Sequence, residues 1–268
     1  MTYTVFGASG FIGRHLVAYL RSVGEEVYIA PRDLSDLPSD KHLGHIIYAI
    51  GMTANFRGRP FDTVDAHVGA LSEILRSSSF DSLLYLSSTR IYQNADQGLE
   101  SSSAVVEPGE SSSIYNISKL LGESLCHAAG PAVTRVARLS NVYGSGMPAE
   151  NFLHVICRSA LDDGVVRLAS TLDSAKDYVA ISDVTKLVCQ IASRGQHSVY
   201  NVASGRSTSH QRILDLMRDQ IDFEVEVDES ATRQEFPAIN IDLAKAEFGY
   251  QSTSFEVGFD IYLRSLLS

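Results

Sequence analysis

Two spacings of apolar residues alternate along the chain. Short unbroken apolar runs are typical of strands covered on both faces, whereas apolar residues that recur every three or four positions are typical of amphipathic helices. The runs predict strands over 3–6, 27–30, 45–51, 83–86, 133–139, 165–168 and 199–203, with a further short one near 223–227. The wider spacing predicts helices that begin near 11, 64, 114, 150 and 182. Strands that alternate with helices predict an α/β fold with a parallel sheet.

Three glycines stand where the first predicted strand meets the first predicted helix. At such a place glycine allows a tight turn, a close approach of the backbone to a diphosphate, and close packing of helix on strand. The helix start adds unpaired N–H groups and a positive dipole end. An ordinary strand-to-helix turn is the alternative, but the position of the glycines favours a dinucleotide site. The expected cofactor contacts are Gly7, Ala8, Ser9, Gly10, Phe11, Ile12 and Gly13.

The end of the second predicted strand bears on which dinucleotide is bound. An acidic residue there would bind the adenosine ribose hydroxyls, whereas an arginine nearby would accept a 2′-phosphate. Pro31 occupies the acidic position and Arg32 follows it, which favours NADP and assigns Arg32 to the cofactor site. The alternative is a solvent-exposed Arg32 with Asp33 as the ribose ligand, which would favour NAD.

Composition excludes several classes of protein. A formal net charge of −10 argues against nucleic acid as a partner, because binding to phosphates needs a dense basic face. No apolar run approaches the ~20 residues that cross a bilayer, so a cytoplasmic protein with no membrane partner is expected. Cys126, Cys157 and Cys189 are expected to be core thiols, and the scattered histidines predict no metal site. The acidic loop 93–113, which contains Glu100, is expected to be solvated.

Tyr115 and Lys119 lie four positions apart in a predicted helix and therefore share one of its faces. A phenol with its usual pKa near 10 is a poor acid or base at neutral pH. A nearby ammonium, together with the positive nicotinamide ring of an oxidised cofactor, would favour the phenolate and lower that pKa. Ser88, at the end of strand 83–86, would hold a substrate oxygen against the phenol. A surface pair is the alternative for Tyr115 and Lys119 alone. The glycine turn and the Ser87-Ser88 pair favour Ser88, Tyr115 and Lys119 as the catalytic set.

Together these motifs resemble the extended short-chain dehydrogenases/reductases of the NAD(P)-dependent epimerase/dehydratase type. The motifs that carry the resemblance are Gly7-x-x-Gly10-x-x-Gly13, Leu86-Ser87-Ser88-x-x-x-Tyr92, Tyr115-Asn116-Ile117-Ser118-Lys119 with Glu123, Arg138-x-x-Asn141-Val142-Tyr143-Gly144, and Lys176-Asp177-Tyr178-Val179-x-x-x-Asp183-Val184. The resemblance implies a doubly wound parallel Rossmann sheet with a smaller, interleaved C-terminal α/β lobe that binds substrate. We expect a dinucleotide-binding domain over 1–143, to which 179–203 return, and a substrate lobe over 144–178 and 204–268.

The resemblance also implies further site residues. Additional cofactor contacts are expected from Ala49, Ile50, Gly51, Ser87, Ser140, Tyr115 and Lys119. Substrate contacts are expected from Ser88, Thr89, Asn141 and Arg233, although a solvated surface role is the alternative for Arg233. Substrates of the family are mostly nucleotide sugars, and its members often form homodimers through the helix that bears the tyrosine.

Departures from subfamily patterns narrow the expected reaction. The 4,6-dehydratases carry Asp and Glu where this chain has Thr89 and Arg90, so dehydration has no obvious proton carriers here. The epimerase-reductases that make GDP-fucose carry a Cys at the position of Arg90 and a His near Gly146, and both are missing. The remaining expectation is NADPH-dependent reduction of the 4-keto group of a nucleotide-linked deoxysugar, in polysaccharide or deoxysugar biosynthesis. The alternatives are a 4-epimerase with bound NAD and a non-catalytic NADP-sensing module.

Overall fold

A parallel sheet of six strands forms the centre of the computed structural model, which describes residues 1–53, 55–110, 112–130 and 132–267. The order of its strands is β2-β1-β3-β4-β5-β9, and every neighbouring pair is parallel. These strands are β1 (Thr2–Phe6), β2 (Glu26–Ile29), β3 (His45–Tyr48), β4 (Ser82–Ser88), β5 (Thr134–Leu139) and β9 (Val199–Val202).

The direction in which strands are added to the sheet changes at β1. β2 lies on one side of β1 and forms the edge of the sheet, and β3 lies on the other side. The connection 30–44 between β2 and β3 holds a short 3-10 turn, Leu34–Asp36, and adds no strand beyond β2. Crevices at the carboxyl ends of strands beside such a change of direction are where open α/β sheets bind ligands.

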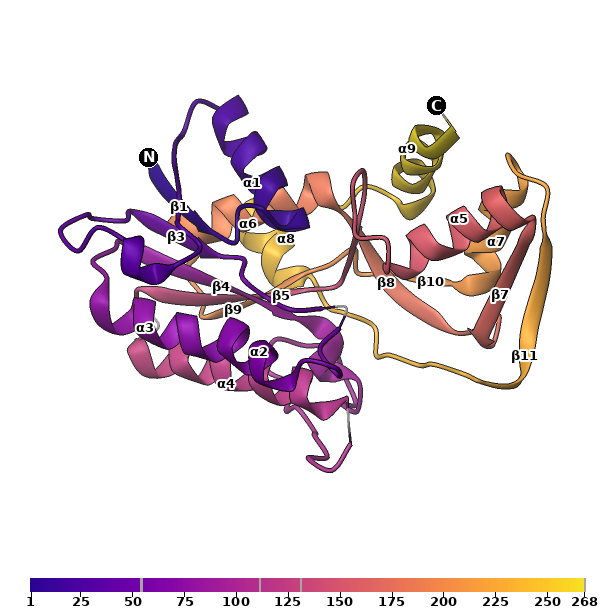
Figure 1. Cartoon of the computed structure of the whole chain (residues 1–268), viewed down its shortest axis with the longest axis horizontal. Coiled ribbons are helices and arrows are strands. Elements are labelled where there is room, and N and C mark those ends of the chain that lie inside the picture. The colour runs from indigo at the N-terminus through magenta and orange to yellow at the C-terminus, as the bar shows by residue number, and fades with distance from the viewer. Residues whose placement is uncertain (54, 111, 131, 268) are drawn as a thin grey trace.

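Helices cover both faces of the sheet (Figure 1). One face carries α1 (Phe11–Ser22), α6 (Ile181–Arg194) and α8 (Asp242–Phe248), and the other carries α2 (Pro60–Val64), α3 (Ala70–Ser77) and α4 (Ser113–Ala129). Separate buried clusters fill the two faces, with Leu16, Val184 and Leu187 in one and Ile74, Tyr85 and Cys126 in the other. The predicted doubly wound α/β fold is therefore confirmed, and Cys126, Cys157 and Cys189 are buried and free as expected.

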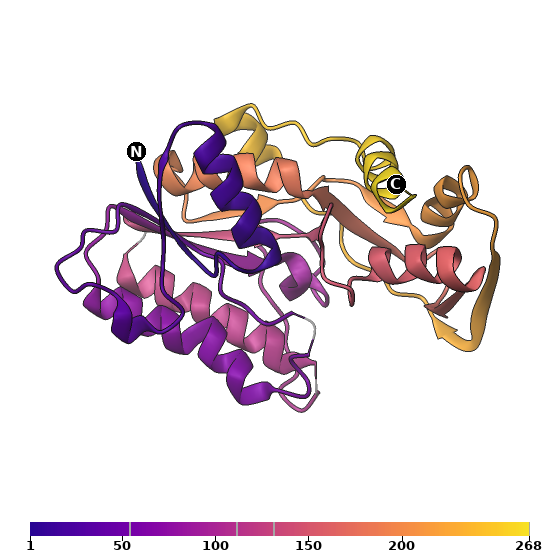
Figure 2. The ribbon, with the colours of Figure 1, turned by 45° about the horizontal axis from the view of Figure 1, so that its top comes forward.

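A smaller lobe with its own core lies beside the carboxyl ends of the central strands (Figure 2). It contains α5 (Phe152–Asp163), α7 (His210–Arg218), α9 (Phe255–Leu267), β6 (Asn141–Tyr143), β7 (Val165–Ser170), β8 (Ala175–Ala180), β10 (Ser207–Ser209) and β11 (Glu224–Thr232). These strands form two small sheets, β10-β8-β6 and β11-β7. The return of β9 to the central sheet shows the interleaving, while the functional division of the chain at 143, 179 and 203 stays a prediction.

Helix α1 contacts both parts of the molecule. The Arg14 guanidinium donates a hydrogen bond to the carbonyl oxygen of Gly146, and the ring of His15 lies 3.0 Å from the carbonyl oxygen of Ser145. Phe11 packs against the core of the central sheet and against the core of the smaller lobe. The first helix therefore joins the two parts directly.

The helix predicted over 64–76 starts earlier in the structure and is interrupted by a π-helical turn. Helical structure begins earlier, at Pro60, and a π-helical turn over Asp65–Gly69 separates α2 from α3. Such turns are rare and often lie at functional sites. The turn places His67 in the protein interior, under the helix that bears Tyr115.

Candidate active site

A cleft of about 570 Å³ lies where the carboxyl ends of the central strands meet the smaller lobe. The first turn of α1, the ends of β3, β4 and β5, and one face of α4 line its inner part. Residues of β8 and the segment 236–239 line its outer part. The cleft therefore joins the predicted cofactor turn to the predicted catalytic residues.

The turn before α1 has no room for side chains at two of its glycines. Gly7 has a φ of +79°, and a Cβ there would lie 2.7 Å from the carbonyl oxygen of Ala49. A Cβ on Gly13 would overlap the carbonyl oxygen of Gly7. Both positions thus require glycine, because the atoms that would clash belong to backbone.

The first turn of α1 faces the cleft with unpaired N–H groups. Gly10 is the N-cap and supplies no side-chain cap, and the first turn carries no acidic residue. Gly10, Phe11 and Ile12 line the cleft. Free N–H groups and the positive dipole end suit a diphosphate, so the residues present fit the phosphates of a dinucleotide.

Tyr115 is buried at the inner wall of the cleft. Its ring lies 5.2 Å from the ring of Phe56 and 5.3 Å from the imidazole of His67, measured between centroids. Burial raises the pKa of the phenol, and a hydrogen bond with Ser88 and the nearby charge of Arg90 oppose that rise. Ser88 and Tyr115 therefore meet as the sequence predicts.

Lys119 lies one helical turn further along the same face of α4. Its ammonium donates a hydrogen bond of 2.8 Å to the carbonyl oxygen of Leu86, and burial lowers its pKa to about 7. Lys119 is not among the groups that lower the pKa of Tyr115 in this structure; Ser88 and Arg90 are. The sequence assigns that effect to the lysine together with an oxidised nicotinamide, so it stays a prediction for the cofactor-bound site. Without the cofactor, the ammonium is directed to the end of β4.

His67 connects the end of β3 to α4. Its Nε2 accepts a hydrogen bond from the backbone N–H of Met52, so the proton lies on Nδ1 and is donated to the Ser118 hydroxyl at 2.8 Å. That hydroxyl in turn donates to the carbonyl oxygen of Tyr115. Burial and then the charge of Lys119 lower the pKa of His67 to about 3, so the ring stays neutral.

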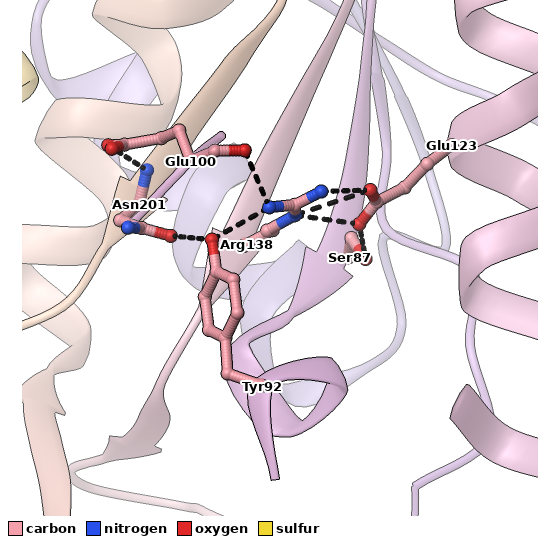
Figure 3. Close-up of polar contacts among 6 residues, drawn as sticks. All are labelled: Ser87, Tyr92, Glu100, Glu123, Arg138 and Asn201. Atoms are coloured by element: carbon pink, nitrogen blue, oxygen red, sulfur yellow. Dashed lines mark hydrogen bonds and ion pairs between the residues drawn. The ribbon is translucent and has the colours of Figure 1, made fainter. Parts of the chain in front are cut away.

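A buried ion pair supports the strand that carries Ser88. Arg138 on β5 pairs with Glu123 on α4, and Glu123 also accepts a hydrogen bond from the hydroxyl of Ser87. Figure 3 shows how this network continues through Tyr92 and the Glu100 backbone to Asn201 on β9. Since Oε1 of Glu100 also accepts from the N–H of Asn201, the expectation that this residue is merely solvated is wrong.

Asp177 connects the outer wall of the cleft to the central sheet. It accepts hydrogen bonds from the hydroxyls of Ser140 and Ser204, and burial raises its pKa. The side-chain amide of Asn141 donates to the carbonyl oxygen of Asp177 at 2.8 Å. Both Ser140 and Asn141 line the cleft, as their predicted contacts require.

The structure gathers most, but not all, of the predicted site residues. The predicted residues that line the cleft are Gly10, Phe11, Ile12, Ala49, Ile50, Gly51, Ser87, Ser88, Thr89, Tyr115, Lys119, Ser140 and Asn141. Ala8 and Ser9 belong to the glycine turn but do not line the cleft. Gly7 and Gly13 do not line the cleft either, but their lack of a side chain permits the turn.

Two predicted arginines lie outside the lining of the cleft. Arg32 is exposed beyond the end of β2. Arg233 is 56% exposed and pairs with Asp173 and Glu235, so its contact with substrate stays a prediction.

Sequence reasoning missed three residues of this site. Arg90 and Lys176 line the cleft, and His67 lies behind Tyr115. Arg90 and Lys176 lie within the motifs over 86–92 and 176–184, and this position could have marked them as site residues. Nothing in the spacing of His67 marks it.

Comparisons with known proteins identify the family of this chain. A model of the NAD dependent epimerase/dehydratase family matches residues 3–203, and the chain belongs to this family. GDP-6-deoxy-D-mannose reductase of Pseudomonas aeruginosa is 28% identical over 263 residues, which cover 87% of this chain and 85% of that protein.

Two solved structures show the same fold over the whole chain. MoeE5 in complex with UDP-glucose and NAD has a TM-score of 0.82 and 20% identity, with 100% of both chains covered. RMD from Pseudomonas aeruginosa complexed with NADPH has a TM-score of 0.75 and 21% identity, again with 100% of both chains covered. Within the described residues, no helix combines the length and apolarity needed to cross a membrane, and no cluster of ligating side chains suits a metal ion.

Proposed function

We propose that this protein is an NADPH-dependent oxidoreductase that reduces the 4-keto group of a nucleotide-linked sugar. The observation that carries the proposal is that Ser88, Tyr115 and Lys119 line the same cleft as the free helix start at Gly10. The named reductase that this chain resembles, and the structural neighbour complexed with NADPH, support the choice of reaction and cofactor.

The cofactor would lie along the inner part of the cleft, with its diphosphate at the first turn of α1 and its nicotinamide beside Lys119. When bound, it supplies the hydride that reaches the carbonyl carbon. Arg32 would contact the 2′-phosphate. The exposed Asp33 accepts hydrogen bonds from the N–H and the hydroxyl of Ser35, both at Oδ1.

Three side chains of the protein transfer the proton and position the reacting groups. Tyr115 donates its proton to the carbonyl oxygen as the alkoxide forms, and its raised pKa keeps that proton in place beforehand. Ser88 holds the same oxygen and stabilises the phenolate by hydrogen bonding. Lys119 contacts the nicotinamide ribose and supplies positive charge beside the phenol once a ligand displaces it from the carbonyl oxygen of Leu86.

A nucleotide-sugar 4-epimerase is the second candidate, supported by the neighbour complexed with UDP-glucose and NAD. An epimerase oxidises and re-reduces the same carbon and leaves no net change in the cofactor, whereas a reductase consumes NADPH. The smaller lobe would bind the nucleotide sugar in both cases.

One experiment separates the two. The purified protein is incubated with NADPH or NADH and with dTDP- and GDP-linked 4-keto-6-deoxyhexoses, and the absorbance of the reduced nicotinamide is followed. In parallel, UDP-glucose is added without cofactor. We expect consumption of NADPH with a 4-keto sugar. An epimerised product without net change in the nicotinamide absorbance would overturn the reductase proposal.

A further inference from the structure

A second cavity, of about 730 Å³, lies outside the candidate active site. Its walls come from the segment 204–209, which includes β10, from residues of α7 and α8, and from the segment 249–256, which leads into α9. None of the described residues that line it also lines the cleft. Its volume lies within the range of about 300–1,000 Å³ that small-molecule sites occupy.

Cationic side chains outnumber acidic ones in the lining of this second cavity. Arg206, Arg212 and Lys245 line it, and Glu256 supplies the only carboxylate among the described residues of the lining. Arg212 lies 3.3 Å from Glu256 and Lys245 lies 3.4 Å from Asp242, and both pairs are exposed. Exposed pairs of this kind stabilise a protein little, so they yield readily to a stronger anion.

Arg206 has a guanidinium without a partner on a backbone that is held in place. In the ranges 1–53, 55–110, 112–130 and 132–267, this guanidinium forms no ion pair and donates no hydrogen bond. Its backbone N–H donates to Oδ2 of Asp177 at 3.1 Å, and the N–H of Ser204 donates to Oδ1 at 2.9 Å. A fixed loop loses less conformational freedom when its side chain binds a ligand.

Three serine hydroxyls of the lining add hydrogen-bond donors to these cations. Ser209 and Ser254 accept hydrogen bonds at Oγ from the N–H groups of Arg212 and Val257, so the O–H of each serine can still donate. Ser207 is exposed in the same lining. No described residue accepts a hydrogen bond from any of these three hydroxyls. Free hydroxyls beside cations suit an anion that has several acceptor oxygens.

Two carboxylates lie behind the lining, but their oxygens are already engaged. Asp177 accepts hydrogen bonds from the N–H and the hydroxyl of Ser204, and Asp183 accepts from the N–H and the hydroxyl of Thr253. Asp177 is 5% exposed and Asp183 is 7% exposed. An entering ligand would therefore meet the cations and hydroxyls of the lining, and not these carboxylates.

We propose that the second cavity is a non-catalytic binding site for a ligand that carries a phosphate or diphosphate group. A phosphate offers three strong acceptor oxygens, two of which can pair with the forked donors of an arginine while hydroxyls bind the third. The buried Ile241, Tyr250 and Phe255 form the apolar part of the lining and would contact the rest of an organic phosphate. The proposal goes beyond the proposed function and does not rest on it, because Ser88, Tyr115 and Lys119 lie in the other cavity.

The test compares probes with and without phosphate. Binding of pyrophosphate, glucose 1-phosphate and UDP is measured by calorimetry, with glucose and uridine as the matched compounds that lack phosphate. We expect at least one phosphorylated probe to bind with a millimolar or lower Kd. Binding of pyrophosphate alone would identify a free anion as the ligand, whereas tighter binding of glucose 1-phosphate or UDP would identify an organic phosphate. If no phosphorylated probe binds more tightly than the compounds without phosphate, the proposal is wrong.

Variants of the lining show which cavity holds the phosphate. In Arg206→Gln the affinity for the bound probe should fall about tenfold, the order that a charge-assisted hydrogen bond supplies, and in Arg206→Gln/Arg212→Gln it should fall further. Arg167→Gln, at an exposed arginine of β7 that pairs with Glu226, is the control and should keep the wild-type affinity. Thermal unfolding verifies that each variant is folded. Wild-type affinity in the double variant would place the anion in the cleft and overturn the second site.

Discussion

Nη2 of Arg138 lies 2.7 Å from Oε2 of Glu123, and its Nε lies 3.1 Å from Oε1, so the guanidinium contacts both oxygens of a carboxylate that is only 3% exposed. This pair joins β5 to the helix that carries Tyr115 and Lys119, and its hydrogen bonds reach the strand end at Ser87.

Removal of one partner of this pair should destabilise the fold strongly. Arg138→Met leaves a buried carboxylate without its cation, which is expected to lower the free energy of unfolding by about 3–5 kcal/mol. Urea unfolding measures the change. The matched control is Arg158→Met in the exposed pair with Asp162, where a loss of about 0–1 kcal/mol is expected. Equal losses in the two variants would show that the buried network does not stabilise this region.

Tyr115→Phe should abolish proton donation while preserving the cleft. Since a positioned acid contributes typically 10²–10⁴-fold, turnover should fall by about that factor, with binding of NADPH little changed. The rate is followed by nicotinamide absorbance, and cofactor binding by nicotinamide fluorescence. Tyr262→Phe, which removes a hydroxyl bonded to His154 in the smaller lobe, is the control and should retain its rate. A Tyr115→Phe protein with wild-type turnover would exclude the catalytic assignment.

Lys119 should make stability depend on pH in the absence of ligand. Burial lowers its pKa to about 7 in the folded protein, whereas an unfolded lysine titrates near 10.4, so between these values the unfolded chain binds more protons. The contribution of this group to the free energy of unfolding therefore rises with pH across that window. Lys119→Met should lose this rise, as measured by urea unfolding at several pH values between about 7 and 9.5. Lys245→Met, at an exposed lysine, should retain it. Parallel pH profiles of wild type and Lys119→Met would contradict the prediction.

Gly13→Ala should damage both the fold and cofactor binding. The added Cβ overlaps the carbonyl oxygen of Gly7, and because the clash is with backbone, the turn must move. We expect a loss of about 1–3 kcal/mol in stability, as for other overpacked sites. The affinity for NADPH should fall at least tenfold by fluorescence titration. Gly109→Ala, at a glycine with open space around it, is the control. Normal cofactor affinity in Gly13→Ala would place the dinucleotide elsewhere.

The sequence predicts those parts of the molecule whose physics is local. The glycine turn, the Tyr115–Lys119 spacing and the apolar strands each depend on residues close together in the chain, and the structure has all of them. The π-helical turn that buries His67 depends instead on packing against α4, which no helical periodicity records.

The contacts between charged side chains from distant parts of the chain could not be predicted from the sequence either. Arg138 reaches Glu123, Tyr92 and Glu100 across three other segments, and only the folded sheet brings them together. In the protein without its cofactor, the charge that lowers the pKa of Tyr115 is that of Arg90, and Lys119 is directed to the carbonyl oxygen of Leu86. The effect of Lys119 on that pKa beside an oxidised nicotinamide stays a prediction.

The contacts that α1 makes across the molecule have a mechanical consequence. Arg14 and His15 bond to the backbone of Gly146 and Ser145 from the same helix whose first turn faces the cleft. The two lobes can separate only if these hydrogen bonds break. Opening of the cleft would therefore act directly on the helix whose first turn we propose as the site of the dinucleotide diphosphate.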